Sequence, residues 1–290
     1  AVIAAGPSLD TSSAKLAAER ESYYIIATDT AYSALLQRRI TPDACVSVDA
    51  QMISHGHFFN IAPSTLFIFD LSANPAAVRK AAAAGATIIF IETGHPIAQL
   101  ASHYGGGPCF PHIETGSGTV TAAAAAFAVA AGFKDIVFFG ADFAYTRGKP
   151  YTKGCYLDGL YNGTSTRSCT AEGRFCSLMY RTQLLAQGKD FTTAVLSGYK
   201  KSTWDFMEKK GFESAGDGRF QKQHNDSCIR CKPFSFADFS TVFKQRLKED
   251  RLLLLPYIAW LKQKEPKRSR KSILNLAQST TLVYTESNEN

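Results

Sequence analysis

Short apolar runs alternate with amphipathic segments along the first third of the chain. The runs fall at residues 1–5, 23–27, 44–48, 65–69 and 87–91. The segments between them have helical spacing: Leu16 and Ala17 face inward, for example, while Lys15 and Glu19 face outward. Strands that alternate with helices over short turns predict a parallel sheet with right-handed crossovers. We therefore expect an α/β fold, with a Rossmann-like, mostly parallel sheet and helices on both faces.

The stretch 114–151 continues this pattern and carries the candidate site. It opens with small residues that expose backbone N–H groups, namely Gly116, Ser117 and Gly118. The alanine-rich, uncharged segment 119–131 predicts a helix that is buried on most sides. An apolar run at 136–139 predicts the next strand. The loop beyond that strand offers polar side chains, among them Asp142, Tyr145 and Tyr151.

Polar side chains also stand at the ends of three earlier strands. They are Ser8, Thr28, Asp29 and Asp49. Because the carboxyl ends of parallel strands share one edge of a sheet, where ligands bind in open α/β folds, we expect these groups to converge. The start of the alanine-rich helix would add N–H donors and a positive dipole end for an anion such as a phosphodiester. The structural alternative makes Asp29 and Asp49 helix N-caps, Gly116–Gly118 a turn, and the tyrosines surface residues.

The remainder of the chain is less regular. Residues 151–176 predict a long loop of the kind that often covers a ligand. Residues 172–187 and 200–210 predict helices, 211–233 is polar and weakly patterned, and 237–251 predicts a long helix. We therefore expect a nucleotide-sugar-binding domain at 1–200 and a mainly helical, basic C-terminal extension at 201–290.

Charge and composition exclude several classes of protein. The net charge of the 290 residues is +7, and ten Lys/Arg against three Asp/Glu between Lys244 and Lys271 account for all of it. A basic tail is therefore expected rather than a nucleic-acid-binding surface. No apolar run reaches the roughly 18 residues of a membrane-spanning helix. The first residues already have strand character, so we expect a preceding region to be missing.

The seven cysteines indicate a reducing, cytoplasmic compartment, because their number is odd and they are scattered. Cys228 and Cys231 form a CxxC motif, and His224 lies four residues before it. A second pair of ligands at zinc-knuckle spacing is missing, so no metal site is expected there.

Four blocks carry a family resemblance. They are Ala5-Gly6-Pro7-Ser8-Leu9, the strand end Thr28-Asp29, the run Pro42-Asp43-Ala44-Cys45-Val46-Ser47-Val48-Asp49, and the stretch from Gly116 to Tyr151. In this order they resemble the motility-associated factor family, flagellin glycosyltransferases whose core is similar to bacterial sialyltransferases. The similarity to the sialyltransferases is closest from Gly118 to Tyr151, with a small-residue loop, an alanine-rich helix, a Gly-x-Asp-Phe motif and a later tyrosine. The resemblance covers roughly residues 1–200.

The resemblance implies transfer of a nonulosonic acid from a CMP-activated donor to a Ser/Thr hydroxyl of flagellin, without a required cofactor. It implies nucleotide contacts at Gly6, Pro7, Ser8, Thr28, Asp29, Asp49, Gly116, Ser117, Gly118 and Asp142. Tyr145 and Tyr151 would steady the phosphate, and His224 would be the base, with His112 and Glu114 as further candidates. Sialyltransferases have asparagines in place of Asp29 and Asp49, so these carboxylates would face ribose hydroxyls, the cytosine amino group or a cation.

Two alternatives remain. The chain also resembles archaeal 6-hydroxymethylpterin diphosphokinases, which share Gly-Pro-Ser-Leu, transfer a diphosphate from ATP and need Mg²⁺. Asp29 and Asp49 would suit that metal. A non-catalytic nucleotide-binding scaffold domain is the third possibility.

Overall fold

A computed structural model describes residues 1–95, 98–99, 101–102, 110–115 and 118–229, with isolated positions between 237 and 263. The chain divides into two compact units. The first comprises 1–90 and 113–229 and holds nearly all of the described structure. The second comprises 91–112 and 230–290; within it, Nδ1 of His112 lies 2.5 Å from Oε2 of Glu92.

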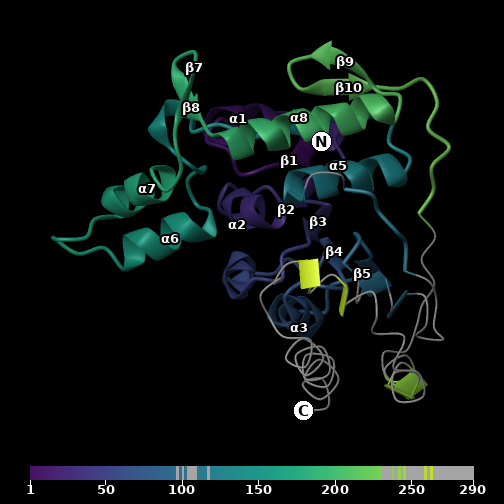
Figure 1. The fold of residues 1–290 in the computed structure, drawn as a ribbon. Coiled ribbons are helices and arrows are strands. Elements are labelled where there is room, and N and C mark those ends of the chain that lie inside the picture. Colours follow the sequence, from purple (N-terminus) through teal and green to yellow (C-terminus); the bar gives the residue numbers. More distant parts are fainter. Residues whose placement is uncertain are drawn as a thin grey trace. The chain divides into compact units, whose positions relative to one another are not determined.

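The helices and strands of Figure 1 have the following bounds. The strands are β1 (Val2–Ile3), β2 (Ile26–Thr28), β3 (Ala44–Ser47), β4 (Leu66–Asp70), β5 (Ile88–Ile91), β6 (Asp135–Phe139), β7 (Leu185–Gln187), β8 (Asp190–Thr192), β9 (Glu213–Gly216) and β10 (Arg219–Gln221). The α-helices are α1 (Leu9–Ala18), α2 (Asp29–Gln37), α3 (Pro75–Ala83), α5 (Val120–Ala130), α6 (Tyr156–Gly163), α7 (Ala171–Met179) and α8 (Ala194–Lys209). Short 3₁₀ helices are η1 (Arg20–Ser22), η2 (Met52–Phe58) and η3 (Thr146–Gly148).

The main sheet has eight strands in the order β5-β4-β3-β2-β1-β6-β10-β9. Strand β1 lies between β2 and β6 and pairs in parallel with both, with Val2 opposite Ile26 and Phe138. At one edge, β10 runs antiparallel to β6, and β9 runs antiparallel to β10. The predicted Rossmann-like, mostly parallel α/β fold is therefore confirmed.

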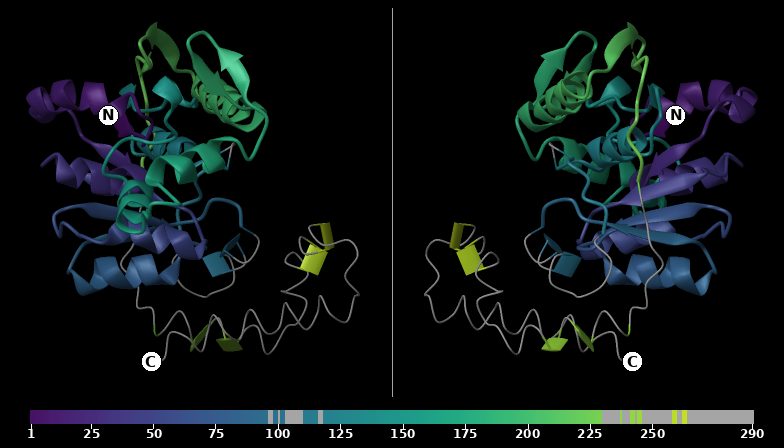
Figure 2. Two further views of the ribbon diagram at one scale, coloured as in Figure 1. Left: turned by 90° about the vertical axis from the view of Figure 1, so that its left-hand side faces the viewer. Right: turned by 90° about the vertical axis from the view of Figure 1, so that its right-hand side faces the viewer.

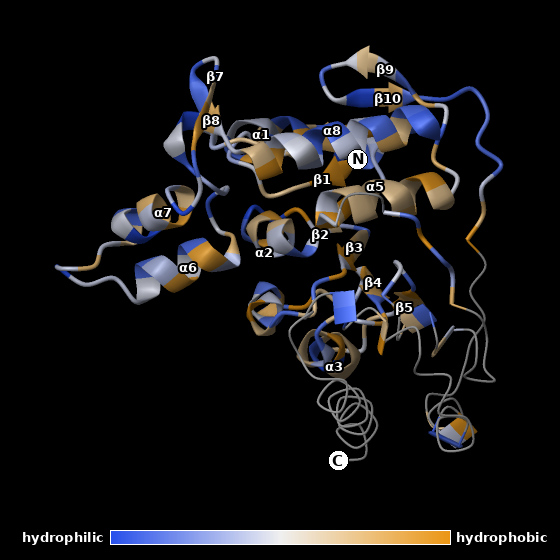
Figure 3. Ribbon diagram, in the orientation of Figure 1, coloured by the Kyte–Doolittle hydropathy of each residue, from blue (hydrophilic) through white to orange (hydrophobic). Residues whose placement is uncertain are grey.

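Helices cover both faces of this sheet, as expected. Helices α1, α2 and α3 lie on one face, and α5 and α8 lie on the other (Figure 2). Helix α5 is apolar along its length (Figure 3), and Thr121–Val129 are all buried. Its alanines allow the helix to lie close against β1, β2 and β3. Gly132, with φ +90°, then ends the helical segment.

The predicted elements are wrong in three places beyond Tyr151. The loop 151–176 contains helix α6, and the helix expected at 172–187 stops at Met179, before the β7–β8 hairpin. The weakly patterned segment 211–233 supplies β9 and β10. The domain boundary predicted after residue 200 falls inside α8. Ten of the fifteen residues of the helix predicted at 237–251 lie outside the described residues. No described helix is long and apolar enough to cross a membrane.

Candidate functional site

A cavity of about 290 Å³ lies at the carboxyl ends of β1, β2 and β6. The chain leaves β1 toward β2 on one side, whereas β6 reaches β1 from the other side, so the strand order reverses between β1 and β6. Such a switch point leaves a crevice in which α/β proteins bind ligands. The lining includes five residues predicted from the sequence, namely Gly6, Thr28, Asp142, Tyr145 and Tyr151. Of the four strand-end residues that were expected to converge, Thr28 lines this cavity, whereas Ser8, Asp29 and Asp49 do not.

Two glycines allow the loops after β1 and β6 to approach each other closely. The N–H of Gly6 donates to the carbonyl of Gly140 over 2.8 Å. A Cβ on Gly6 would overlap that carbonyl and the carboxylate of Asp142. Gly140 has φ +66°, and a Cβ there would overlap the carbonyl of Ala4. The wall of the cavity therefore requires glycine at both positions.

We expect Gly140→Ala to lower the free energy of unfolding by about 3 kcal/mol or more, because left-handed strain of about 1–2 kcal/mol adds to the backbone overlap. Urea denaturation measures this loss. Gly148→Ala is the matched control: its φ is +68°, but no atom lies within 4 Å of its added Cβ. Equal losses in the two variants would contradict the overlap.

Ser8 and Asp142 join the loops by side-chain contacts. The Ser8 N–H donates to Oδ2 of Asp142 over 2.9 Å, and its hydroxyl donates to Oδ1. The carboxylate thus sits at the start of α1, where the helix dipole favours a negative charge. A ligand phosphate would therefore compete with Asp142 for the N–H of Ser8. Pro7, between Gly6 and Ser8, is buried.

The two tyrosines offer hydroxyl donors to the cavity. Among the described residues, neither hydroxyl has a hydrogen-bond partner, and both rings line the cavity. Burial raises the pKa of Tyr151 to about 12 and also raises the pKa of Tyr145. Both phenols are consequently protonated near neutral pH and can donate. The backbone N–H of Tyr145 donates to the carbonyl of Phe191 over 2.6 Å, which ties this loop to β8.

The start of α5 completes the cavity. Thr119, Val120 and Thr121 line it, and Thr119 makes no side-chain cap. The first-turn N–H groups of a helix have no partner within the helix, so they are available to an anion. Gly118 precedes them with φ +66°. Gly116 and Ser117, predicted for this loop, lie outside the described residues.

Asp29 lies directly after β2, at the start of α2, but it does not line the cavity. It is 1% exposed and accepts hydrogen bonds from the Ser47 hydroxyl (2.7 Å) and the Thr30 N–H (2.7 Å). Burial raises the pKa of Asp29, although the nearby His57 acts in the opposite direction and lowers it. Burial likewise lowers the pKa of His57, whose Nδ1 has no partner among the described residues. No sequence pattern pointed to this histidine beside Asp29.

Asp49 also lies away from the cavity lining. Its side chain accepts from the N–H of Gln51 over 2.9 Å, and its carbonyl accepts from the N–H of Asn74 over 3.1 Å. It therefore organises the turn into η2. Nucleotide contacts by Asp29 and Asp49 stay predictions.

His224 is exposed at the other end of α5. Its neighbour Asn225 donates to the carbonyls of Val129 (2.8 Å) and Phe133 (2.9 Å), where α5 ends. The cavity lies at the start of that helix, so the structure does not bring His224 to it. No group of three potential metal ligands occurs among the described residues; Cys228 is exposed, and Cys231 lies outside them.

Sequence reasoning missed other residues of the lining. Leu178, Leu196 and Tyr199 reach the cavity from α7 and α8. Glu114, a secondary candidate for the base, is instead bound by Lys210 (3.0 Å) and Lys209 (3.4 Å).

Proteins of similar fold or sequence are known. The solved structure of the MAf glycosyltransferase from Magnetospirillum magneticum AMB-1 matches 96% of this chain with a TM-score of 0.54 and 14% identity, which shows the shared fold. This chain covers 44% of that protein. Two uncharacterized proteins of Treponema pallidum (strain Nichols) are related in sequence. One is 33% identical over 231 residues, 77% of each chain; the other is 30% identical over 168 residues, 57% of this chain and 29% of the relative.

The model of one protein family, 6-hydroxymethylpterin diphosphokinase MptE-like, matches residues 1–148, just over half of the chain. This match spans β1 to η3 and so includes the strand ends and the loop that build the cavity. The chain therefore belongs to the MptE-like family.

Proposed function

We propose that this protein is a glycosyltransferase that binds a CMP-activated nonulosonic acid in the switch-point cavity and transfers the sugar to an acceptor hydroxyl on a protein such as flagellin. One observation carries the proposal. Two tyrosine hydroxyls that have no partner among the described residues, and the start of α5, which has no side-chain cap, lie at one cavity at the carboxyl ends of β1, β2 and β6. The fold shared with a glycosyltransferase supports it.

These groups suit the phosphate of the donor. Helix N–H groups and neutral phenols are hydrogen-bond donors, and the positive dipole end of α5 favours the negative charge. As the bond to the sugar breaks, charge builds on the departing phosphate oxygen. Fixed donors at that oxygen stabilise the transition state more than the ground state.

Transfer needs a proton acceptor, and we assign this role to Asp142, which lines the cavity. The acceptor oxygen attacks the anomeric carbon, the bond from that carbon to the phosphate oxygen breaks, and CMP leaves with the electron pair. The proton of the acceptor hydroxyl passes to a carboxylate oxygen of Asp142. A carboxylate has about four lone-pair sites, of which Ser8 occupies two, so capacity remains.

The diphosphokinase that names the family is the second candidate, and it requires Mg²⁺. The donor set fits that ion poorly. Asp142 is the single acidic residue among the described residues that line the cavity, and both its oxygens already accept from Ser8. Asp29 is buried and bonded to Ser47 and Thr30. Among the described residues, the lining therefore offers Mg²⁺ a single carboxylate, which already accepts two hydrogen bonds from Ser8.

Isothermal titration with CMP, CTP and ATP, each with and without Mg²⁺, tests the proposal. We expect CMP to bind in the absence of metal. ATP binding that depends on Mg²⁺ would instead favour the diphosphokinase. No binding of any nucleotide would favour a scaffold domain.

A further inference from the structure

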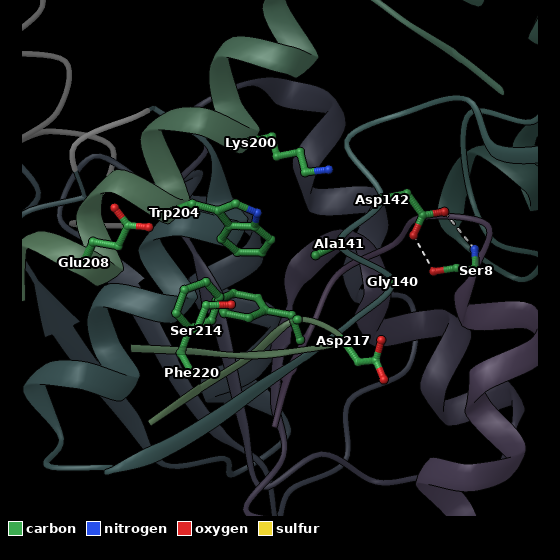
Figure 4. A pocket seen from close by; sticks show the side chains of 12 residues that line it. Ser8, Gly140, Ala141, Asp142, Lys200, Trp204, Glu208, Ser214, Asp217 and Phe220 are labelled. Atoms are coloured by element: carbon green, nitrogen blue, oxygen red, sulfur yellow. Dashed lines mark hydrogen bonds between the residues drawn. The ribbon is translucent and has the colours of Figure 1, made fainter. Parts of the chain in front are cut away.

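A second cavity, of about 350 Å³, lies beside the first. Gly140, Ala141 and Asp142 belong to the lining of both, so ligands in the two cavities would contact the same loop. Helix α8 forms one side of the second cavity, and the β9–β10 hairpin forms another (Figure 4). Its volume is in the range of about 300–1,000 Å³ that is usual for small-molecule sites.

An indole ring, held by neighbouring aromatic side chains, forms part of the wall of this cavity. The ring of Trp204 packs edge-on against Phe138, with centroids 4.9 Å apart, and lies 5.1 Å from Phe220. Phe143 makes a further contact at 5.8 Å. Trp204 is only half-buried, and Figure 4 shows its ring facing the space between Lys200, Asp142 and Asp217. The cavity therefore presents a rigid apolar surface surrounded by polar groups.

The charged groups around the indole are uncommitted. Within the described part of the chain, the side chains of Lys200, Glu208 and Asp217 have no ion-pair or hydrogen-bond partner, although all three residues line the cavity. The hairpin turn holds Asp217 in place, because Asp217 and Gly218 both adopt positive φ, +48° and +71°. The cavity thus offers a cationic donor and two carboxylate acceptors on different sides of one ring.

We propose that this second cavity is the acceptor subsite of the enzyme and that its ligand is a saccharide already attached to the acceptor protein. A sugar ring has an apolar face that packs on an indole, and each hydroxyl both donates and accepts hydrogen bonds. Donors and acceptors of both charge signs around an aromatic ring match that chemistry. A peptide would instead need a strand edge or a row of apolar pockets.

The position of the cavity agrees with this role, which rests on the proposed transfer function. Asp142 belongs to the lining of both cavities, so a hydroxyl bound beside Trp204 can approach the carboxylate that faces the donor. The hydroxyl that receives the nonulosonic acid is then a sugar hydroxyl rather than the side chain of serine or threonine.

Tryptophan fluorescence tests the inference directly. The chain has two tryptophans, so Trp260→Phe leaves Trp204 as the only emitter. We would titrate this variant with the methyl glycosides of galactose, glucose, N-acetylgalactosamine and N-acetylglucosamine, and separately with a Ser/Thr peptide. At least one glycoside should change the emission saturably. Glu208→Gln and Asp217→Asn should each weaken that glycoside about tenfold, because each removes a charged hydrogen-bond acceptor.

Asp205→Asn is the matched control, since Asp205 is exposed on the same helix and does not line the cavity. The inference would be overturned if the emission changed with the peptide but with no glycoside, or if it changed with none of the ligands. CMP titration of the same variants separates it from the proposed function. CMP binding without a glycoside response refutes the acceptor subsite only, whereas a glycoside response without CMP binding refutes the nucleotide-sugar donor.

Discussion

Asp142→Asn should lower the rate of sugar transfer by about 10²- to 10⁴-fold, which is the usual contribution of a positioned general base. The amide has nearly the shape of the carboxylate and can still accept from Ser8, but it cannot take the proton of the acceptor hydroxyl. CMP affinity should change far less than the rate, because the amide can still accept from Ser8 and so keeps the loop in place. The measurement is CMP release at saturating donor and acceptor, with CMP affinity from calorimetry.

Asp70→Asn is a close control for this substitution. Asp70 is the last residue of β4 and accepts from both the N–H (2.7 Å) and the hydroxyl (2.5 Å) of one serine, Ser72, but it lies outside both cavities. It should keep its transfer activity. The transfer rate of Ser8→Ala should lie between the rates of Asp142→Asn and Asp70→Asn, because this substitution removes a hydrogen bond that holds the carboxylate but leaves the carboxylate in place. A transfer rate near that of the wild type in Asp142→Asn would rule out the assigned proton acceptor.

The sheet and its ligand-binding edge were predictable because both depend on local pattern. Apolar runs that end in Gly6, Asp29 or Gly140 mark strand ends, and the alternation with helices predicts a parallel sheet. Once the strands are parallel, their carboxyl ends must share an edge. Five of the predicted residues consequently line one cavity, although they come from segments more than 100 residues apart.

The direction of each side chain was not predictable in the same way. Thr28 and Asp29 are adjacent at the end of β2, yet Thr28 lines the cavity and Asp29 points into a buried cluster with Ser47. That difference arises from packing against η2 and β3, which no local pattern specifies. His224 was a candidate for the general base only because it is the last histidine of the chain. Its position in the sequence does not say where it lies in the fold.

The second cavity was missed for a related reason. It is built from α8, β6, the loop 140–142 and the β9–β10 hairpin, which meet only in the folded chain. One signal was present: Asp217-Gly218 between two short polar strands is a common hairpin turn. Strands of three or four residues with mostly exposed side chains give little periodicity, so the turn was the only local evidence for them.

Tyr151→Phe should reduce the transfer rate by about 10²- to 10³-fold, the effect of removing one donor from a charge-stabilising site. The phenyl ring keeps its packing against the core of β1 and α1, so the fold should be retained. Tyr180→Phe is the control, because Tyr180 is 68% exposed. If Tyr151→Phe transferred the sugar at a rate close to that of the wild type, the Tyr151 hydroxyl would not be a donor to the phosphate.

The raised pKa of Tyr151 supplies a second, independent readout. Burial raises this pKa from 10.0 to about 12, so the stability linked to the neutral phenol is present below pH 10 and is lost as the pH rises toward 12. Wild-type protein should therefore lose more stability over that interval than Tyr151→Phe, as measured by urea denaturation at each pH. If the rate falls but the alkaline stability profiles coincide, the hydroxyl is exposed and contacts the donor from solvent. If the rate falls and the profiles differ as expected, the buried, neutral hydroxyl of Tyr151 donates a hydrogen bond to the departing phosphate.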